Sequence, residues 1–267
     1  MPRPRGARTQ VIGAAIAAVG LLAAAACGQV EDGGQGGGSG GAETRTLTVF
    51  AAASLTESFT TLKKRFETDN PGVTVEFNFG GSSELAQQIN EGAPADVFAS
   101  ANPANMDLVA DEGDAEGEPT VFAQNTLEIA VPPDNPADIQ ELDDLAAENT
   151  KVALCAAEVP CGSAAEKVMA ETGVEITPVT EEEDVKAAMT KVELGEVDAA
   201  LVYKTDVIAA GDKVKGIAFP ESEHAVNDYP IAPLKDAPEA DLAAEWIALT
   251  TSDTGTKVLT DAGFRAP

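Results

Sequence analysis

Residues 46–66, TLTVFAAASLTESFTTLKKRF, contain the pattern that decides the fold. The first part, TLTVFAAA, is a short apolar run with β-branched residues, which predicts a buried strand. The second part carries four large apolar residues spaced three or four positions apart, which is the spacing of one face of an α-helix. These residues are Leu55, Phe59, Leu62 and Phe66. A strand followed directly by an amphipathic helix is the repeating unit of α/β proteins.

The same alternation continues along the chain. Two further strand and helix units occupy residues 73–92 and 94–113. Later strand-like runs, TLEIAVPP, KVALCAA, VDAALVY and YPIAPL, alternate with helical segments at 163–173, 181–195 and 242–263. This order predicts an α/β fold with mostly parallel sheets. Its length suits either one domain or two lobes of about 100 residues each.

The N-terminal segment has the features of an export signal. It begins with MPRPRGAR, which has three arginines and no acid, and continues through VIGAAIAAVGLLAAAAC. This layout predicts a signal peptide over residues 1–26. Cys27 then resembles the lipidated cysteine of a bacterial lipoprotein, although Ala24 stands where that motif usually has leucine. Cleavage without a lipid, giving a freely secreted protein, is the alternative, and the glycine-rich residues 27–44 predict a flexible tether.

The charge of the chain limits its partners. With 45 acidic and 17 basic residues, the formal net charge is −28 at pH 7. Such a charge argues against a nucleic-acid partner. It also repels anions at long range, so an anion site would have to rely on local hydrogen-bond donors.

Two cysteines remain after Cys27. Cys155 and Cys161 stand six positions apart in LCAAEVPC, and in an exported protein such a pair predicts a disulfide. Closing this short loop would contribute roughly 2 kcal/mol to stability. Two free thiols are the alternative. A zinc site is not expected, because His224 is the only histidine and the sequence has no Cys-x2-Cys pair.

Three predicted helix starts carry a small hydroxyl or glycine residue directly after a strand or turn. They are Ser54, Gly81-Ser82 and Gly162-Ser163. Helix capping alone would explain these serines, since SLTE and SAAE match the capping box. Helix starts also leave N–H donors free and gather at the carboxyl ends of parallel strands, where several of them make an anion site. A site of hydroxyls and amides favours a fully deprotonated oxyanion.

Five motifs occur in a fixed order across residues 46–267. They are AAASLTESF, GGSSELAQQINEGAPADVFASA, EDVKAAM, DAALVY and YPIA. In order and spacing they resemble the molybdate-binding proteins of bacterial ABC transporters. The resemblance implies an α/β fold of the two-lobed periplasmic binding protein kind (type II). Parallel-type sheets flanked by helices would form the lobes, and the ligand would lie in the cleft between them.

The resemblance also implies which residues bind the ligand. In that family a tetrahedral oxyanion is held by two serines, backbone amides and a tyrosine hydroxyl, with no charged side chain. Carried over motif by motif, the ligand-binding residues are Ser54, Ser82, Cys161, Val185 and Tyr203. Cys161 and Val185 would bind through backbone N–H groups. A half-buried packing role is the alternative for Tyr203, and Gly81 stands where some relatives have serine.

The same resemblance predicts the organisation and the role of the chain. Lobe 1 would comprise residues 45–124 plus 229–267, and lobe 2 residues 125–228, with crossing strands near Asn125 and Asp228. The expected function is capture of molybdate, and of tungstate, by an extracytoplasmic lipoprotein that serves an ABC importer permease and ATPase. The protein is expected to be a monomer without cofactor or catalytic residues, anchored by its lipid to the outer face of the cell membrane.

Three rival functions fit parts of the sequence. A serine hydrolase would need His224, and the chain has no Gly-x-Ser-x-Gly elbow. Sulfate matches molybdate in charge and shape but is smaller, so the size of the site would have to separate them. Phosphate is less favoured because no aspartate is expected inside the donor motifs. A surface adhesion module is disfavoured because the chain has no repeats.

Overall fold

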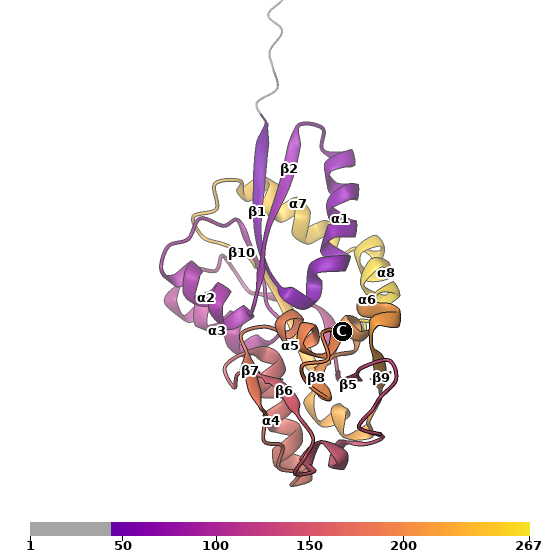
Figure 1. Cartoon of the computed structure of the whole chain (residues 1–267). Helices are drawn as coiled ribbons and strands as arrows, with labels where there is room; N and C mark the ends of the chain where they lie inside the picture. Colours follow the sequence, from indigo (N-terminus) through magenta and orange to yellow (C-terminus); the bar gives the residue numbers. More distant parts are fainter. Residues whose placement is uncertain (1–43) are drawn as a thin grey trace, which may run out of the picture. The chain divides into compact units, whose positions relative to one another are not determined.

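The computed structural model describes residues 44–267 (Figure 1). The predicted signal peptide, Cys27 and residues 28–43 of the predicted tether lie outside the described residues. The helices and strands of the described part are β1 (Arg45–Ala52), η1 (Ala53–Leu55), α1 (Thr56–Asp69), β2 (Val73–Gly80), α2 (Ser82–Asn90), β3 (Val97–Ala99), α3 (Pro103–Glu112), β4 (Thr120–Asn125), β5 (Leu127–Val131), η2 (Leu142–Ala146), β6 (Val152–Cys155), α4 (Pro160–Thr172), β7 (Thr180–Glu182), α5 (Val185–Glu193), β8 (Ala199–Tyr203), α6 (Lys204–Ala210), η3 (Gly211–Lys213), β9 (Lys215–Ile217), η4 (Pro220–Ala225), β10 (Asn227–Pro233), α7 (Ala240–Thr251) and α8 (Asp253–Asp261).

The first sheet has the strand order β2-β1-β3-β10-β4. β1 pairs in parallel with β2 and β3, whereas β10 pairs antiparallel with β3 and β4. Successive residues of β1 point to opposite faces of the sheet. Val49 packs in one buried cluster with Phe59 of α1 and Trp246 of α7, and Phe50 packs in another with Leu85 of α2. Helices therefore cover both faces of this sheet.

The second sheet has the strand order β7-β6-β8-β5-β9. β6 pairs in parallel with β7 and β8, and β5 pairs antiparallel with β8 and β9. Val168 of α4 and Met189 of α5 pack against this sheet in one buried cluster with Leu201 of β8. This lobe has its own hydrophobic core.

Both sheets are mixed, but most strands in each run in the same direction, as the sequence predicts. In each sheet one strand, β10 or β5, runs against the other four. These two strands bring the chain into a lobe from the other lobe, so they begin at the cleft, where the remaining strands end. Leu127 at the start of β5 pairs with Tyr203 at the end of β8. Asn227 at the start of β10 likewise pairs with Asn125 at the end of β4.

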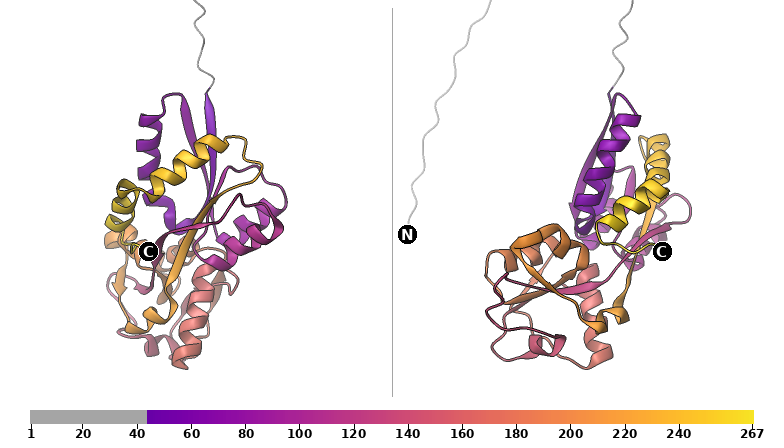
Figure 2. Two further views of the ribbon diagram at one scale, coloured as in Figure 1. Left: turned by 180° about the vertical axis from the view of Figure 1, so that it is seen from behind. Right: turned by 90° about the vertical axis from the view of Figure 1, so that its right-hand side faces the viewer.

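The two sheets and their helices form two lobes connected by adjacent crossings (Figure 2). β4 of the first sheet ends at Asn125 and β5 of the second begins at Leu127, while β10 returns the chain beside β4. This is the predicted two-lobed fold, and it brings the carboxyl ends of most strands to the interface between lobes. Across the part of the chain described here, no helix combines the length and apolar character needed to cross a membrane.

Candidate functional site

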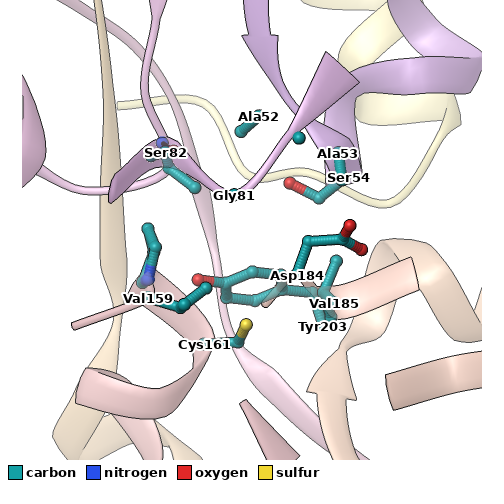
Figure 3. A pocket seen from close by; sticks show the side chains of 13 residues that line it. Ala52, Ala53, Ser54, Gly81, Ser82, Val159, Cys161, Asp184, Val185 and Tyr203 are labelled. Carbon is teal, nitrogen blue, oxygen red and sulfur yellow. Dashed lines mark hydrogen bonds between the residues drawn. The ribbon is translucent and has the colours of Figure 1, made fainter. Parts of the chain in front are cut away.

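A small cavity lies between the lobes at the carboxyl ends of their strands (Figure 3). Its volume is about 10 Å³, which is of the order of the space that one water-sized occupant needs. All five predicted ligand-binding residues line it. The complete lining is Ala52, Ala53, Ser54, Gly80, Gly81, Ser82 and Ala101 from the first lobe, and Val159, Pro160, Cys161, Asp184, Val185 and Tyr203 from the second.

The first lobe contributes two serine hydroxyls. Ser54 lies in η1 directly after β1, and Ser82 is the first residue of α2 directly after β2 and Gly81. Their exposed fractions are 4% and 1%. Ser82 Oγ accepts a hydrogen bond from the Ala101 N–H at 3.0 Å, and Ser54 Oγ lies 2.9 Å from the Tyr229 hydroxyl. Neighbouring protein groups therefore fix both hydroxyls in position.

The predicted capping boxes of Ser54 and Ser163 are not formed, which removes capping as the explanation of these serines. The N-cap residue of α1 is Leu55, with no side-chain capping bond. α4 begins at Pro160, earlier than expected, because proline is well suited to the first helical position, where no N–H partner is needed. Ser163 instead bonds to the Pro160 carbonyl. The early start makes Cys161 the first residue of α4 with an N–H group.

A disulfide between Cys155 and Cys161 joins the start of α4 to the end of β6. Gly162 packs directly on the loop that this bond closes, since a Cβ there would collide with the Ala156 carbonyl oxygen. The loop and the disulfide therefore hold the beginning of the helix. Because Cys161 lies in the first turn, its N–H has no partner within the helix and is available to a ligand.

The start of α5 presents Val185 to the cavity. Asp184 caps this helix, with Oδ1 accepting from the N–H groups of Lys186 at 2.7 Å and Ala187 at 2.9 Å. The Asp184 carbonyl accepts from the Ala188 N–H at 3.2 Å. These bonds leave the Val185 N–H outside the cap. An aspartate does line the cavity, contrary to the sequence expectation, but its Oδ1 is engaged with its own helix.

Tyr203, the last residue of β8, is 1% exposed, and its hydroxyl points into the space between the lobes (Figure 3). Asn227 Nδ2 donates a hydrogen bond to this hydroxyl oxygen at 2.7 Å. Burial raises the pKa of the Tyr203 phenol well above its ordinary value, so the group stays protonated. Tyr203 is thus fully buried, with a hydroxyl able to donate, rather than a half-buried packing residue.

Three buried polar residues behind the cavity were not predicted as part of the site. Asn125, Asn227 and Tyr229 lie on the crossing strands β4 and β10. Tyr229 bonds to Ser54, Asn227 bonds to Tyr203, and Asn125 bonds to Tyr229. None of the three lines the cavity, so motifs of ligand contacts do not reveal them. The signal that could have found them is their position, because strands that cross between lobes begin or end at the cleft.

The cavity contains no basic side chain among the described residues that line it. Lys186, adjacent to Val185, instead pairs with Glu57 of the first lobe at 2.9 Å and with Asp206 of the second at 3.2 Å. Burial raises the pKa of Asp206 to about 6 despite this lysine. Burial alone would lower the pKa of Lys186, but Asp206 and Glu57 outweigh that effect and raise it. An ion pair therefore connects the lobes without placing a cation in the cavity.

The lobes are in close contact around the cavity. A Cβ on Gly81 would collide with the Glu183 carbonyl oxygen of the opposite lobe. Asn105 Nδ2 donates to the Glu158 carbonyl oxygen at 3.3 Å. These contacts define a closed arrangement, and they explain why glycine rather than serine occupies position 81: any side chain there would push the lobes apart.

The arrangement can bind a small anion but lacks the parts of a hydrolase. His224 is exposed in η4 and does not line the cavity, so it forms no triad with Ser54 or Ser82 there. Over residues 44–267 there is also no group of three or more His, Cys, Asp or Glu side chains placed to hold a metal ion. Hydroxyl and amide donors placed between two lobes are suited to binding a ligand as the lobes close around it.

The fold and the cavity together define a two-lobed solute-binding protein. The family model described as bacterial extracellular solute-binding protein matches residues 47–265, and the chain belongs to this family. Its members are binding proteins rather than enzymes, which confirms the predicted class and excludes the hydrolase.

Named relatives and solved structures agree with this assignment. The Mycobacterium tuberculosis protein named molybdate-binding protein ModA is 44% identical over 223 residues, covering 84% of this chain and 85% of the relative. The periplasmic molybdate-binding protein of Azotobacter vinelandii shares the fold, with a TM-score of 0.73 and 21% identity over 83% of this chain and 99% of that one. The sulfate-binding protein SubI of M. tuberculosis shares it with a TM-score of 0.71 and 17% identity, over 83% and 87% of the two chains.

Proposed function

We propose that this protein captures molybdate between its lobes and delivers it to an ABC importer. The observation that carries the proposal is that hydroxyls and free helix-start amides from both lobes converge on one cavity without a cation. The expected ligand set is Ser54, Ser82, Cys161, Val185 and Tyr203. Hydrogen bonds to a charged group contribute about 1.5–3 kcal/mol each. Several of them around a desolvated dianion therefore suffice for tight binding. The relative that is 44% identical supports molybdate as the ion.

Closure and capture are then one event. The first lobe brings Ser54 and Ser82, and the second brings Cys161, Val185 and Tyr203, so the full donor set exists only when the lobes meet. The closed shape distinguishes the loaded protein from the empty one. The partner that recognises the closed form would be the permease and ATPase complex of an ABC importer.

Several finer features belong to the same proposal. Tungstate would bind as well, since it has the charge and tetrahedral geometry of molybdate. The chain would act as an exported monomer without a cofactor, held at the outer face of the membrane by a lipid on Cys27. The rigid lobes would be residues 45–124 plus 229–267 and residues 125–228.

Calorimetric titration of the purified protein with molybdate, tungstate, sulfate and phosphate at matched ionic strength tests the ligand. We expect tight one-to-one binding of molybdate and tungstate and far weaker binding of sulfate and phosphate. Binding of sulfate alone would assign the site to the smaller oxyanion. Binding of none of these ions would refute an oxyanion-binding role.

A further inference from the structure

We infer that Asn125, Asn227 and Tyr229 are positioning residues that set the direction in which the cavity hydroxyls donate their hydrogens. This inference rests on the proposed function, because it concerns how the same site distinguishes one oxyanion from another. The three residues lie on the crossing strands β4 and β10 and are 1%, 4% and 0% exposed, respectively.

Asn227 sets the hydrogen of Tyr203. Its Nδ2 lies 2.7 Å from the Tyr203 hydroxyl oxygen, 3.0 Å from the Ala101 carbonyl oxygen and 3.3 Å from the Pro160 carbonyl oxygen. Backbone carbonyl oxygens only accept hydrogen bonds, so the Asn227 amide atom that faces them must be the nitrogen of its NH₂ group and not its oxygen. Tyr203 therefore receives a hydrogen bond from Asn227, and its own hydrogen is left for another acceptor. The acceptors on that side are the Tyr229 hydroxyl and a ligand in the cavity that Tyr203 lines, and we assign the hydrogen to the ligand.

Asn125 and Tyr229 set the hydrogen of Ser54 in the same way. Asn125 Oδ1 accepts from the Thr126 N–H at 3.0 Å, so its NH₂ group faces Thr205 Oγ1 at 2.9 Å and the Tyr229 hydroxyl at 3.4 Å. Tyr229 accepts from Asn125, and its hydroxyl lies 2.9 Å from Ser54 Oγ, where either oxygen can be the donor. In the arrangement inferred here Tyr229 donates and Ser54 accepts. Burial raises the pKa of the Tyr229 phenol, so this donor persists. The hydrogen of Ser54 is then left for the cavity.

As a consequence, all of the cavity hydroxyls are arranged in the same way: each accepts from the protein and donates to the ligand. Ser82 completes it, since its oxygen already accepts from the Ala101 N–H. Each of the three cavity hydroxyls thus receives one hydrogen bond from the protein and presents a hydrogen to the ligand. An oxyanion without a proton satisfies all of them. One that carries a proton, such as hydrogen phosphate, would set its O–H against a donor and leave a hydrogen bond unmade, which is costly in a buried site.

A double-mutant cycle between Tyr229→Phe and Ser54→Ala tests the first arm, with molybdate and inorganic phosphate as the probes. Tyr229→Phe removes one hydroxyl and frees Ser54 to accept as well as donate. We expect about threefold to tenfold weaker molybdate binding and a similar fall in the molybdate-to-phosphate affinity ratio. In the Ser54→Ala background we expect Tyr229→Phe to change neither quantity by more than about twofold.

A second cycle, between Asn227→Leu and Tyr203→Phe, tests the other arm. Asn227→Leu should lower the molybdate affinity about threefold to tenfold when Tyr203 is present and have little effect when it is Phe. Asn78→Leu is the matched control, because Asn78 donates to Gln88 on the outer part of the first lobe and does not line the cavity.

The outcomes separate this inference from the proposed function. If the parent binds molybdate and the Tyr229→Phe effect vanishes without Ser54, the positioning role is supported even if Asn227→Leu fails to fold. If the parent binds but the Tyr229→Phe effect is the same in both backgrounds, the positioning role is overturned and the proposed function stands. A parent that binds no oxyanion overturns both.

Discussion

The two lobes reach the cavity with different kinds of donor. The first lobe uses the side-chain hydroxyls of Ser54 and Ser82, which hydrogen bonds hold in place. The second uses backbone amides at Cys161 and Val185, held by a disulfide and by an aspartate cap, together with one phenol. A side-chain donor can be removed by truncation, whereas a backbone donor can be changed only through the geometry that holds it. Substitutions at the site should therefore act directly or indirectly according to the kind of donor they affect.

The largest effect should come from removing a hydroxyl that we propose binds the ion. Ser54→Ala and Tyr203→Phe should each weaken molybdate binding about 10-fold to 100-fold, because each deletes one hydrogen bond to a charged group. The free energy of unfolding should change little. Calorimetry and denaturant unfolding measure the two quantities. Ser58→Ala is the control, since Ser58 is equally buried but bonds to the Leu55 carbonyl instead. If Ser54→Ala and Tyr203→Phe both bound molybdate as tightly as the parent, the site assignment would be wrong.

The next effect tests whether both lobes must close on the ion. Gly81→Ala places a Cβ against the Glu183 carbonyl of the second lobe, and overpacking of this kind costs about 1–3 kcal/mol. Only the closed form pays it, so molybdate affinity should fall about tenfold while the free energy of unfolding of the ligand-free protein stays near that of the parent. Gly80→Ala is the neighbouring comparison: Gly80 also lines the cavity, but its Cβ would meet Leu85 and Glu84 of its own lobe, the former at an ordinary 3.6 Å. Equal affinities for the two variants would contradict closure in this arrangement.

Removing the disulfide of the second lobe should change molybdate binding less. Replacing both Cys155 and Cys161 by Ala should lower the free energy of unfolding by about 2 kcal/mol, because the unfolded chain loses its cross-link. Molybdate binding should weaken only a few-fold, since the backbone N–H at position 161 remains. Denaturant unfolding of parent and variant, with and without reductant, measures the effect. Complete loss of binding would mean that the sulfur atoms themselves contribute to the site.

Asp206 should make the stability of the second lobe depend on pH. Burial raises its pKa from 3.8 to about 6, so the folded protein holds a proton that the unfolded chain has already released between these two values. The parent should therefore become more stable as the pH falls from about 6 towards 4. Asp206→Asn should raise the free energy of unfolding at pH 8 by about 1–2 kcal/mol, and this gain should disappear near pH 4. A gain that is the same at both pH values would contradict the assignment of the effect to Asp206.

The smallest effect should come from the ion pair between the lobes. Glu57→Gln removes the carboxylate that Lys186 contacts from the first lobe and leaves its pairing with Asp206 intact. Since partly exposed ion pairs contribute about 0–1 kcal/mol, molybdate affinity should fall about twofold to threefold at low salt and be unchanged at high salt. Asp261→Asn is the control, because its pair with Lys257 lies within one helix. An effect of Glu57→Gln that did not depend on salt would point to a role other than this ion pair.

The sequence predicted the overall class of fold, and all five residues that it predicted as ligand-binding are among those that line the cavity. It succeeded because strand and helix periods are local, and because residues that touch a ligand belong to short motifs. It failed where the outcome depends on contacts between distant segments. The capping boxes of Ser54 and Ser163 are replaced by helix starts that neighbouring residues set. The antiparallel direction of β5 and β10, which follows from the crossings between lobes, was not predicted. Asn227 and Tyr229 act on the hydroxyls only through the fold, so no local pattern marks them. The role of the five residues in binding remains a prediction.

The central claim is that both lobes hold one oxyanion at the same point through uncharged donors. Crystals grown with tungstate, measured at the tungsten absorption edge, would locate the ion directly by anomalous scattering. We expect a single peak within hydrogen-bond distance of Ser54 Oγ, Ser82 Oγ, the Tyr203 hydroxyl and the N–H groups of Cys161 and Val185. A peak bound instead by Lys186 or another cation, or contacts from one lobe alone, would contradict this account of the protein.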